Sequence, residues 1–250
     1  MIKLIASDVD GTLIGREQNR TDAETERLIK TFISSGIEFA TVSGRDIFSL
    51  RKVFPYAEKD IWFVACNGAL CVKDGKTLMS RPVSPMSVIN ALKISTEKRK
   101  KVVFCSDKAL YVSGPDCFFN YVNEQSGGNA VRVKTCADIK GPVYKISFFS
   151  QKSYAGFDET PFDLRVCYDR NGWKEYVSRF VNKGAALFDL QTRLGMSKAV
   201  TAAAGNEMAD SEMLMKAEYR FSSEPELAEA TGAALCEMGA PVLQKIKSSI

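Results

Sequence analysis

Residues 7–13 read SDVDGTL and follow the apolar stretch IKLIA, residues 2–6. The stretch predicts a short buried strand, so Asp8 and Asp10 come where that strand ends. Side chains two positions apart in a strand point the same way, and Gly11 allows the backbone to turn at once. Both carboxylates can therefore face one site, where neighbouring acids favour different protonation states. The alternative is a solvated strand end whose aspartate caps the loop.

Composition places the chain among ordinary globular proteins. It has 250 residues, of which 45% are hydrophobic and 26% charged, enough for one large domain or two smaller ones. The formal net charge of +4 suits a small anionic substrate and does not require nucleic acid. No run of 18 apolar residues is present, and Ser7 and Asp8 interrupt any signal-peptide hydrophobic region. We therefore expect a cytoplasmic protein that contacts neither membrane nor nucleic acid.

The chain contains no histidine. This excludes Ser-His-Asp and Cys-His catalysis and the common histidine-rich zinc sites. Proton transfer must come from a carboxylate, lysine, tyrosine, cysteine or water, and any metal is expected to be a hard ion held by oxygen, with Mg²⁺ the first candidate. The seven cysteines form no C-x-x-C pair, which predicts reduced, buried thiols.

Strands and helices alternate at the start of the chain. Thr21 is expected to cap a helix with Glu24 in a capping box, and strands are expected at 37–42 and 62–66. This order predicts an α/β fold with a parallel sheet, in which ligands bind beyond the carboxyl ends of the strands. Polar residues fall at that edge after each of the three strands: Asp8, Asp10, Ser43 and Asn67.

The pattern changes after residue 81. Closely spaced strands and two helices form an α+β segment, and the alternating pattern resumes at Lys183 with a helix over 184–194. We therefore expect a discontinuous Rossmann-like core made of residues 1–81 and 182–250, with residues 82–181 inserted as a second domain. No G-x-G-x-x-G or Walker A pattern occurs.

Further residues at the expected sheet edge could act with the aspartates. Ser43 and Gly44 offer a hydroxyl and backbone N–H groups to an anion, and Lys183 stands at a helix N-terminus, where it opposes the helix dipole. Asp210 lies in a loop after a late strand, with Glu207 nearby. Each has an alternative interpretation: Ser43 and Gly44 could form an ordinary turn, Lys183 could extend into solvent, and Asp210 could cap the helix that follows it. Taken together, the acids, hydroxyl and lysine suit phosphoryl transfer.

These segments resemble the motifs of one family, the haloacid dehalogenase superfamily, and in particular its Cof-type sugar-phosphatase branch. SDVDGTL is similar to the first motif, TVSGR (41–45) to the second and NKGAAL (182–187) to the third. AGNEMADSEML (204–214) stands where the fourth is expected, and CNGA (66–69) resembles another recurrent stretch. The order matches over the whole chain, with a cap domain between the second and third motifs.

The resemblance implies a role for each catalytic residue. Asp8 would attack phosphorus and form an aspartyl-phosphate, and Asp10 would protonate the leaving group and then activate water. Ser43 would bind phosphate oxygens, and Lys183 would neutralise Asp8 and the phosphoryl group. The product would be inorganic phosphate from a small phosphorylated metabolite, and a sugar phosphate is the expected substrate.

The resemblance also implies a binding role for the surrounding residues. Mg²⁺ would be held by Asp8, the Asp10 carbonyl, Asn206 and Asp210. The substrate would contact Gly44, Arg45, Asn67 and Gly68, and the cap domain would determine substrate specificity.

The fourth motif departs from the family pattern at two positions. Asn206 stands where an aspartate usually binds the metal, and Ala209 replaces the usual asparagine. An amide oxygen can bind Mg²⁺ without adding charge, so metal affinity should fall unless Glu207 compensates. The alternative function is a catalytically weakened protein that binds a phosphometabolite or a partner. A response-regulator receiver and a glycosyltransferase fit the length and the motif position less well.

Overall fold

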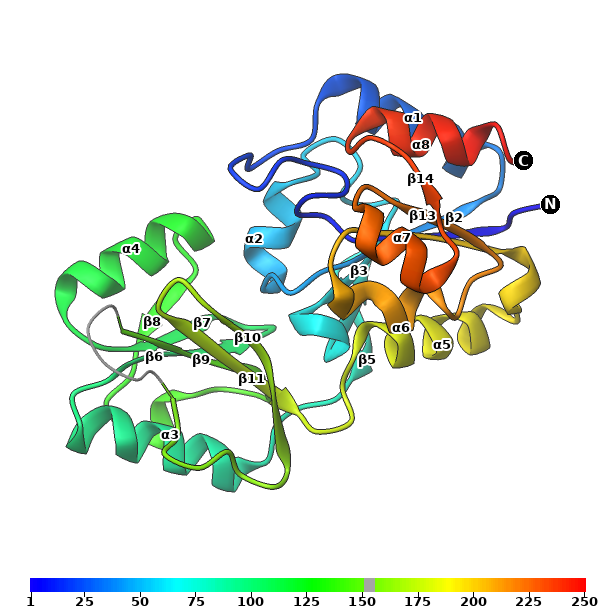
Figure 1. Cartoon of the computed structure of the whole chain (residues 1–250). Coiled ribbons are helices and arrows are strands. Elements are labelled where there is room, and N and C mark those ends of the chain that lie inside the picture. The colour runs from blue at the N-terminus through cyan, green and yellow to red at the C-terminus, as the bar shows by residue number, and fades with distance from the viewer. Residues whose placement is uncertain (151–155) are drawn as a thin grey trace.

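The computed structural model describes residues 1–150 and 156–250, which form two lobes joined side by side (Figure 1). The first lobe, here called the core, contains both chain termini. In the described residues its sheet has eight strands in the order β14-β13-β12-β1-β2-β3-β4-β5. These strands are β1 (Leu4–Ser7), β2 (Glu38–Val42), β3 (Trp62–Ala65), β4 (Leu70–Lys73), β5 (Lys76–Ser80), β12 (Thr201–Gly205), β13 (Tyr219–Ser222) and β14 (Ala234–Leu235).

The strand that precedes the two aspartates lies in the middle of this sheet. All four residues of β1 are buried, and it pairs in parallel with β2 on one side and β12 on the other. Ser7 is in register with Thr41 and with Ala204. The carboxyl ends of three strands distant in sequence therefore meet at one edge, and the α/β fold class is confirmed.

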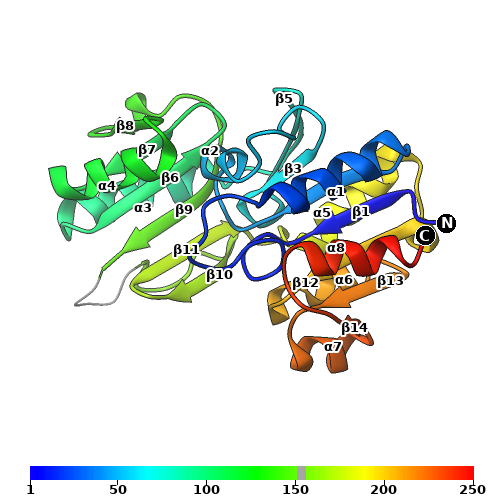
Figure 2. The same cartoon turned by 90° about the horizontal axis from the view of Figure 1, so that it is seen from above.

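Helices cover both faces of the core sheet (Figure 2). One face packs on α1 and α8 and the other on α5, α6 and α7. A short helix, α2, follows β2. Their bounds are α1 (Ala23–Ser34), α2 (Ile47–Lys52), α5 (Lys183–Leu194), α6 (Ser211–Leu214), α7 (Pro225–Thr231) and α8 (Ala240–Lys247). The expected capping box at Thr21 and Glu24 is wrong, because Asp22 is the N-cap of α1 and accepts a hydrogen bond from the Thr25 N–H.

Two core strands were not predicted. After β3 the chain reverses through a 3₁₀ turn, Cys66–Gly68, and β4 and β5 add to the sheet in antiparallel orientation. Asn67 adopts φ 58°, a left-handed conformation that asparagine tolerates well. The two strands are short and the outer one is largely exposed, so their sequence carries little apolar periodicity.

The second lobe, here called the cap, has its own sheet. In the described part of the chain its six strands run in the order β10-β11-β9-β6-β7-β8, and α3 and α4 lie on opposite faces (Figure 1). The bounds are α3 (Pro85–Glu97), β6 (Lys101–Ser106), β7 (Leu110–Ser113), α4 (Asp116–Ser126), β8 (Ala130–Arg132), β9 (Val143–Phe149), β10 (Leu164–Arg170) and β11 (Trp173–Ser178). The domain boundaries at residues 82 and 182 stay a prediction. They are supported by the strands, because β6–β11 form the cap sheet and all the other described strands form the core sheet.

Two expectations from composition can be compared with the fold. Within the described residues, none of the helices combines the length and the apolar character that crossing a bilayer requires. All seven cysteines are free, but only Cys66, Cys71 and Cys105 are buried. The prediction that the thiols are buried is therefore wrong for the other four, which lie on half-exposed or exposed segments.

Candidate active site

Asp8 and Lys183 form the centre of the site. Asp8 follows β1 directly and is 5% exposed, and the Lys183 ammonium donates to its Oδ1 atom at 2.7 Å. The same ammonium donates to Asp210 Oδ1 at 2.5 Å. The three side chains come from the end of β1, the start of α5 and the loop after β12, so only the fold brings them together. A lysine between two buried carboxylates is held in one position by charge and hydrogen bonding.

The start of α5 explains why Lys183 points into the site. The Asn182 side chain caps the helix by accepting from the Ala185 N–H at 2.6 Å. Gly68 packs directly against this helix end, and a Cβ on it would lie 2.6 Å from the Asn182 carbonyl oxygen. Its φ of 104° also favours glycine. Gly68, which was predicted to contact substrate, therefore lets the helix that carries Lys183 approach the turn after β3.

Burial and charge oppose each other at this centre. Burial is the main influence that raises the pKa of Asp8, the Lys183 ammonium lowers it and the Asp210 carboxylate raises it, and together they move it from 3.8 to about 7. Burial alone would lower the pKa of Lys183, but Asp8 and Asp210 hold it above its ordinary value of 10.5. Lys183 therefore remains a cation and favours the ionised form of Asp8, which a nucleophile requires.

Asp210 has both carboxylate oxygens engaged. Its Oδ1 atom accepts from Lys183, and its Oδ2 atom accepts from the backbone N–H groups of Asn206 and Glu207, each at 3.0 Å. The side chain is 0% exposed. This aspartate was predicted as a metal ligand, but the contacts give it a different position: it holds the loop after β12 and orients Lys183.

The Asn206 carboxamide lies against the oxygens that the resemblance assigned to a metal. One of its terminal atoms is 3.0 Å from the Asp10 carbonyl oxygen and 3.1 Å from Asp8 Oδ2 and from Thr12 Oγ1. With the amide nitrogen turned inward, Asn206 can donate hydrogen bonds to these oxygens. With the amide oxygen inward, it lies 3.0 Å from the Asp10 carbonyl oxygen and 3.1 Å from Asp8 Oδ2, which is the spacing of neighbouring ligands around an octahedral Mg²⁺.

The residues therefore fit a magnesium ion, but with little charge. Within the described residues, no group of three or more Asp, Glu, Cys or His side chains gathers where a metal could bind. Asp8 is the one carboxylate among the three oxygens, since Asp10 contributes its backbone carbonyl and Asn206 a neutral amide.

Thr12 and Gly11 of the opening motif shape the surroundings of Asn206; the sequence indicated Gly11 only as a turn residue and did not indicate Thr12. Thr12 is buried and contacts the Asn206 side chain. Gly11 has φ 85°, and a Cβ on it would lie 2.2 Å from Asn206 Nδ2. The glycine is thus required both by the backbone and by the close approach of Asn206. The GTL sequence after Asp10 was the available signal for both.

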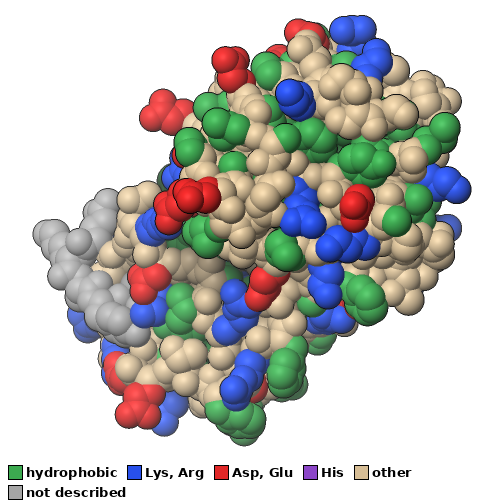
Figure 3. Space-filling view, turned by 45° about the vertical axis from the view of Figure 1, so that its right-hand side comes forward, with side chains coloured by type: hydrophobic (Ala, Val, Ile, Leu, Met, Phe, Trp, Pro, Cys, Tyr) green, Lys and Arg blue, Asp and Glu red, His purple; other side chains and the backbone are tan. Residues whose placement is uncertain are grey.

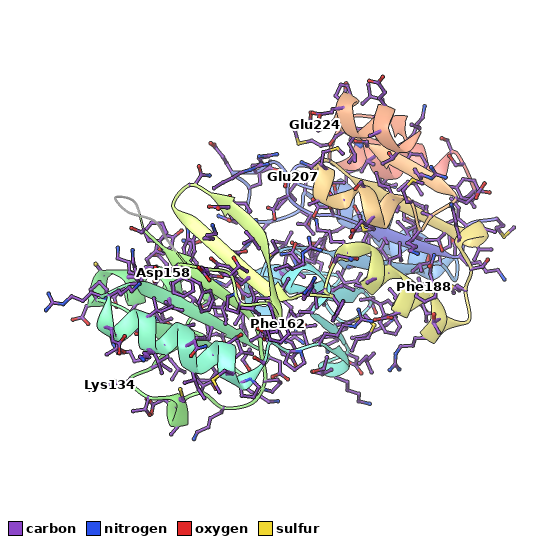
Figure 4. All side chains as sticks on the ribbon, turned by 60° about the horizontal axis from the view of Figure 1, so that its bottom comes forward. Lys134, Asp158, Phe162, Phe188, Glu207 and Glu224 are labelled. Carbon is purple, nitrogen blue, oxygen red and sulfur yellow. The ribbon has the colours of Figure 1, made fainter. Side chains whose placement is uncertain are left out.

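Glu207 does not replace the missing carboxylate. Its Oε1 atom accepts from Arg16 at 2.9 Å and lies 3.4 Å from an Arg170 nitrogen. Arg16 follows the first motif, whereas Arg170 belongs to the β10–β11 hairpin of the cap. Figure 4 shows Glu207 on the side of the core that faces this hairpin. It therefore links the rims of the two lobes rather than adding charge beside Asn206.

Asp10 and Arg45 form a bidentate ion pair. Arg45 Nε donates to Asp10 Oδ2 at 2.8 Å and Arg45 Nη2 to Oδ1 at 2.6 Å. The Asp10 side chain is 35% exposed, so it is the more accessible of the two aspartates. Arg45 was predicted to contact substrate. In the structure it binds Asp10, from a position at the end of the turn that follows β2, and its contact with substrate stays a prediction.

The turn after β2 presents unused hydrogen-bond donors. Ser43 Oγ accepts from the Arg45 N–H at 3.1 Å, and the Ser43 carbonyl accepts from the Asn67 N–H at 2.9 Å. Across the described residues, neither the Ser43 hydroxyl hydrogen nor the Gly44 N–H has an acceptor. The Asn67 side chain packs beside Gly44. Such a turn can bind an anion.

The arrangement as a whole joins a buried carboxylate, a fixed lysine, a second aspartate and an anion-binding turn. Figure 3 shows that basic side chains gather near the junction of the two lobes on the face it presents. These groups define a hydrolase site for an anionic group. Comparison with known proteins agrees. The model of the haloacid dehalogenase-like hydrolases matches residues 5–224, so the chain belongs to that family.

Individual proteins that resemble this chain are phosphatases or have the same fold. The chain is similar to the 5-amino-6-(5-phospho-D-ribitylamino)uracil phosphatase YbjI of Escherichia coli, with 23% identity over 89% of this chain and 85% of the relative. A solved structure from Eubacterium rectale covers 100% of the chain and 99% of its own length at a TM-score of 0.85 and 20% identity. The subclass IIB sugar phosphatase BT4131 gives 0.74 at 15% identity, over 99% and 98%. The expectation of a phosphoric monoester hydrolase of this superfamily is confirmed.

Proposed function

We propose that this protein is a Mg²⁺-dependent phosphatase that hydrolyses small phosphorylated metabolites through an aspartyl-phosphate on Asp8. The observation that carries the proposal is the buried Asp8 carboxylate held 2.7 Å from the Lys183 ammonium at the edge of the sheet. A carboxylate fixed in this way is an activated nucleophile, and the lysine balances charge on the phosphoryl group.

The residues divide the reaction into two steps. An Asp8 oxygen forms a bond to phosphorus while the bond to the leaving oxygen breaks, and Asp10 gives that oxygen a proton. Asp10 then takes a proton from water as the water oxygen attacks phosphorus, which releases Asp8 and inorganic phosphate. Ser43 and Gly44 bind the phosphoryl oxygens. Because Arg45 holds both oxygens of Asp10, it must release them to the reacting groups.

The metal would be held by Asp8, the Asp10 carbonyl and Asn206, and it would neutralise the phosphoryl charge. Asp210 supports the site through Lys183 and the backbone of the metal-binding loop. The oxygen spacing of about 3.0 Å and the hard donor set favour Mg²⁺ over softer ions.

The substrate class rests on the relatives and on the charge of the site. BT4131 is a sugar phosphatase and YbjI acts on a phosphorylated ribitylamino-uracil, both small phosphorylated metabolites. A net charge of +4 favours an anionic ligand. A cytoplasmic location and the absence of a nucleic-acid partner stay predictions.

A second function is favoured by Asn206. Since its amide can bond to Asp8 and Asp10 without a metal, a protein with weak metal affinity could bind a phosphometabolite without turning it over rapidly. One experiment separates the two functions. Phosphate release from an aryl phosphate and a sugar-phosphate panel is measured with and without Mg²⁺, for the wild type and for Asp8→Asn. Metal-dependent release that falls by ~10³-fold or more in the variant supports the phosphatase. Binding without release by the folded wild type supports the alternative.

A further inference from the structure

The cap sheet presents a row of polar side chains to the core. Lys145 and Ser147 lie two positions apart in β9 and therefore on the same face of the sheet. Glu175 of β11 is directly opposite Ser147, and the Ser147 hydroxyl donates to its Oε1 atom at 2.9 Å. The opposite face of β9 carries Ile146 and Phe148, which belong to the apolar core of the cap.

Lys145 crosses from the cap to the core. Its ammonium donates to both Glu175 oxygens at 2.9 Å and to the Gly44 carbonyl oxygen at 2.8 Å. Its side chain is 7% exposed. The three hydrogens of the ammonium thus have three acceptors, so none is left for a substrate. A buried ion pair adds little to stability by itself, because desolvation offsets the attraction. The position of this pair at the junction therefore calls for another explanation.

The acceptor on the core belongs to the anion-binding turn. The Ser43 carbonyl is bound by the Asn67 N–H and the Arg45 carbonyl by the Cys66 N–H, both from the core. The Gly44 carbonyl between them is bound by the cap lysine. That carbonyl shares a rigid peptide plane with the Arg45 N–H, which bonds to Ser43 Oγ. The orientation of Lys145 is thus transmitted to the hydroxyl proposed to bind phosphate.

We propose that Lys145 is a positioning residue for phosphate binding, which completes the turn of Ser43 and Gly44 only when the cap lies on the core. Glu175 and Ser147 hold the lysine in place within the cap sheet. The inference rests on the proposed function, since it assumes that this turn binds the phosphoryl group. It adds that closure of the cap and formation of the anion site are one event.

The test compares two lysines that both join the lobes. Lys52 of α2 donates to the backbone carbonyls of Glu124 and Gln125 in the cap, at 3.2 and 3.0 Å, without touching the turn. Lys145→Met and Lys52→Met are each assayed for the inhibition constant of inorganic phosphate, for kcat and KM, and for the Mg²⁺ concentration that raises the melting temperature. We expect Lys145→Met to raise the phosphate inhibition constant by ~10-fold or more with unchanged Mg²⁺ dependence. Lys52→Met should change it by less than about 2-fold, and Lys145→Arg should recover part of the loss.

The outcomes separate this inference from the proposed function. A wild type that releases phosphate, together with a Lys145→Met variant of unchanged inhibition constant, overturns the inference alone. An equal rise of the phosphate inhibition constant in Lys52→Met overturns the inference too, because phosphate binding would then depend on any contact between the lobes. A wild type that neither releases nor binds phosphate overturns both. If Lys145→Met does not fold, because Glu175 is left buried and unpaired, the charge-balanced double variant Lys145→Met with Glu175→Gln is measured against the same limits.

Discussion

The Nζ atom of Lys183 lies 2.7 Å from Oδ1 of Asp8, although 175 residues separate them in the chain. The same ammonium contacts Asp210, so one cation balances two buried carboxylates. This contact joins the two halves of the discontinuous core at the place where the chemistry is proposed.

Removal of this cation should affect both activity and stability. In Lys183→Met the carboxylates of Asp8 and Asp210 lose their shared partner, which should lower the free energy of unfolding by about 3–5 kcal/mol. Turnover should fall by ~100-fold or more. Denaturant unfolding and phosphate release measure the two effects. Lys198→Met, which changes an exposed lysine, is the control and should change neither. Full stability in Lys183→Met would contradict the balance of charge described here.

Restoring a carboxylate at the fourth motif should reveal how Asn206 acts. Asn206→Asp replaces an amide that can bond to Asp8 and Asp10 with a charge that repels the Asp8 carboxylate. The metal-free variant should therefore melt at a lower temperature, whereas its Mg²⁺ affinity should rise by ~10-fold or more. Calorimetric scans in chelator and in a Mg²⁺ series measure both. Asn120→Asp makes the same change on an exposed face of α4 and should shift neither. A variant whose metal-free melting temperature rises would show that the amide does not bond to its neighbours.

Asp210 offers a direct test of its role. If it orients Lys183 and holds the loop, as its three side-chain hydrogen bonds indicate, Asp210→Asn should lower kcat and stability. It should leave the Mg²⁺ affinity within about 3-fold of the wild type, because no metal ligand is lost. Isothermal titration with Mg²⁺ decides the point. A loss of affinity comparable to that of Asn206→Ala would return Asp210 to the set of metal ligands predicted from the sequence.

Gly11 can be compared with a matched glycine. Gly11→Ala and Gly36→Ala both place a side chain at a positive φ, of 85° and 78°, but only the first meets Asn206, at 2.2 Å. Gly36→Ala should cost about 1–2 kcal/mol from backbone strain. Gly11→Ala should cost about 2–5 kcal/mol and should also displace Asn206 and weaken Mg²⁺ binding. Thermal unfolding with and without Mg²⁺ measures the difference. Equal costs and unchanged metal binding would show that Asn206 can move aside.

The first motif could be interpreted from sequence because its information is local. A buried strand of period two followed by glycine places Asp8 and Asp10 at one edge, and the same logic located Ser43 and Asn67. The sequence did not indicate the role of Thr12 or Lys145, and Asp210 was predicted from it to be a metal ligand. A lysine within the apolar strand VYKISFF was a signal for Lys145, but its partner Gly44 lies about a hundred residues earlier.

The α/β class, the order of the motifs and the identity of the acids, the hydroxyl and the lysine could be predicted from local sequence, because strand periodicity and short-range turns depend on neighbouring residues. The tertiary structure decided how these groups share their bonds. Whether a carboxylate binds a metal or a lysine depends on which cation lies within about 3 Å. That distance is set by the packing of strands and helices far apart in the chain. Asp210 beside Lys183, Arg45 on Asp10 and Lys145 on Gly44 are contacts of that kind.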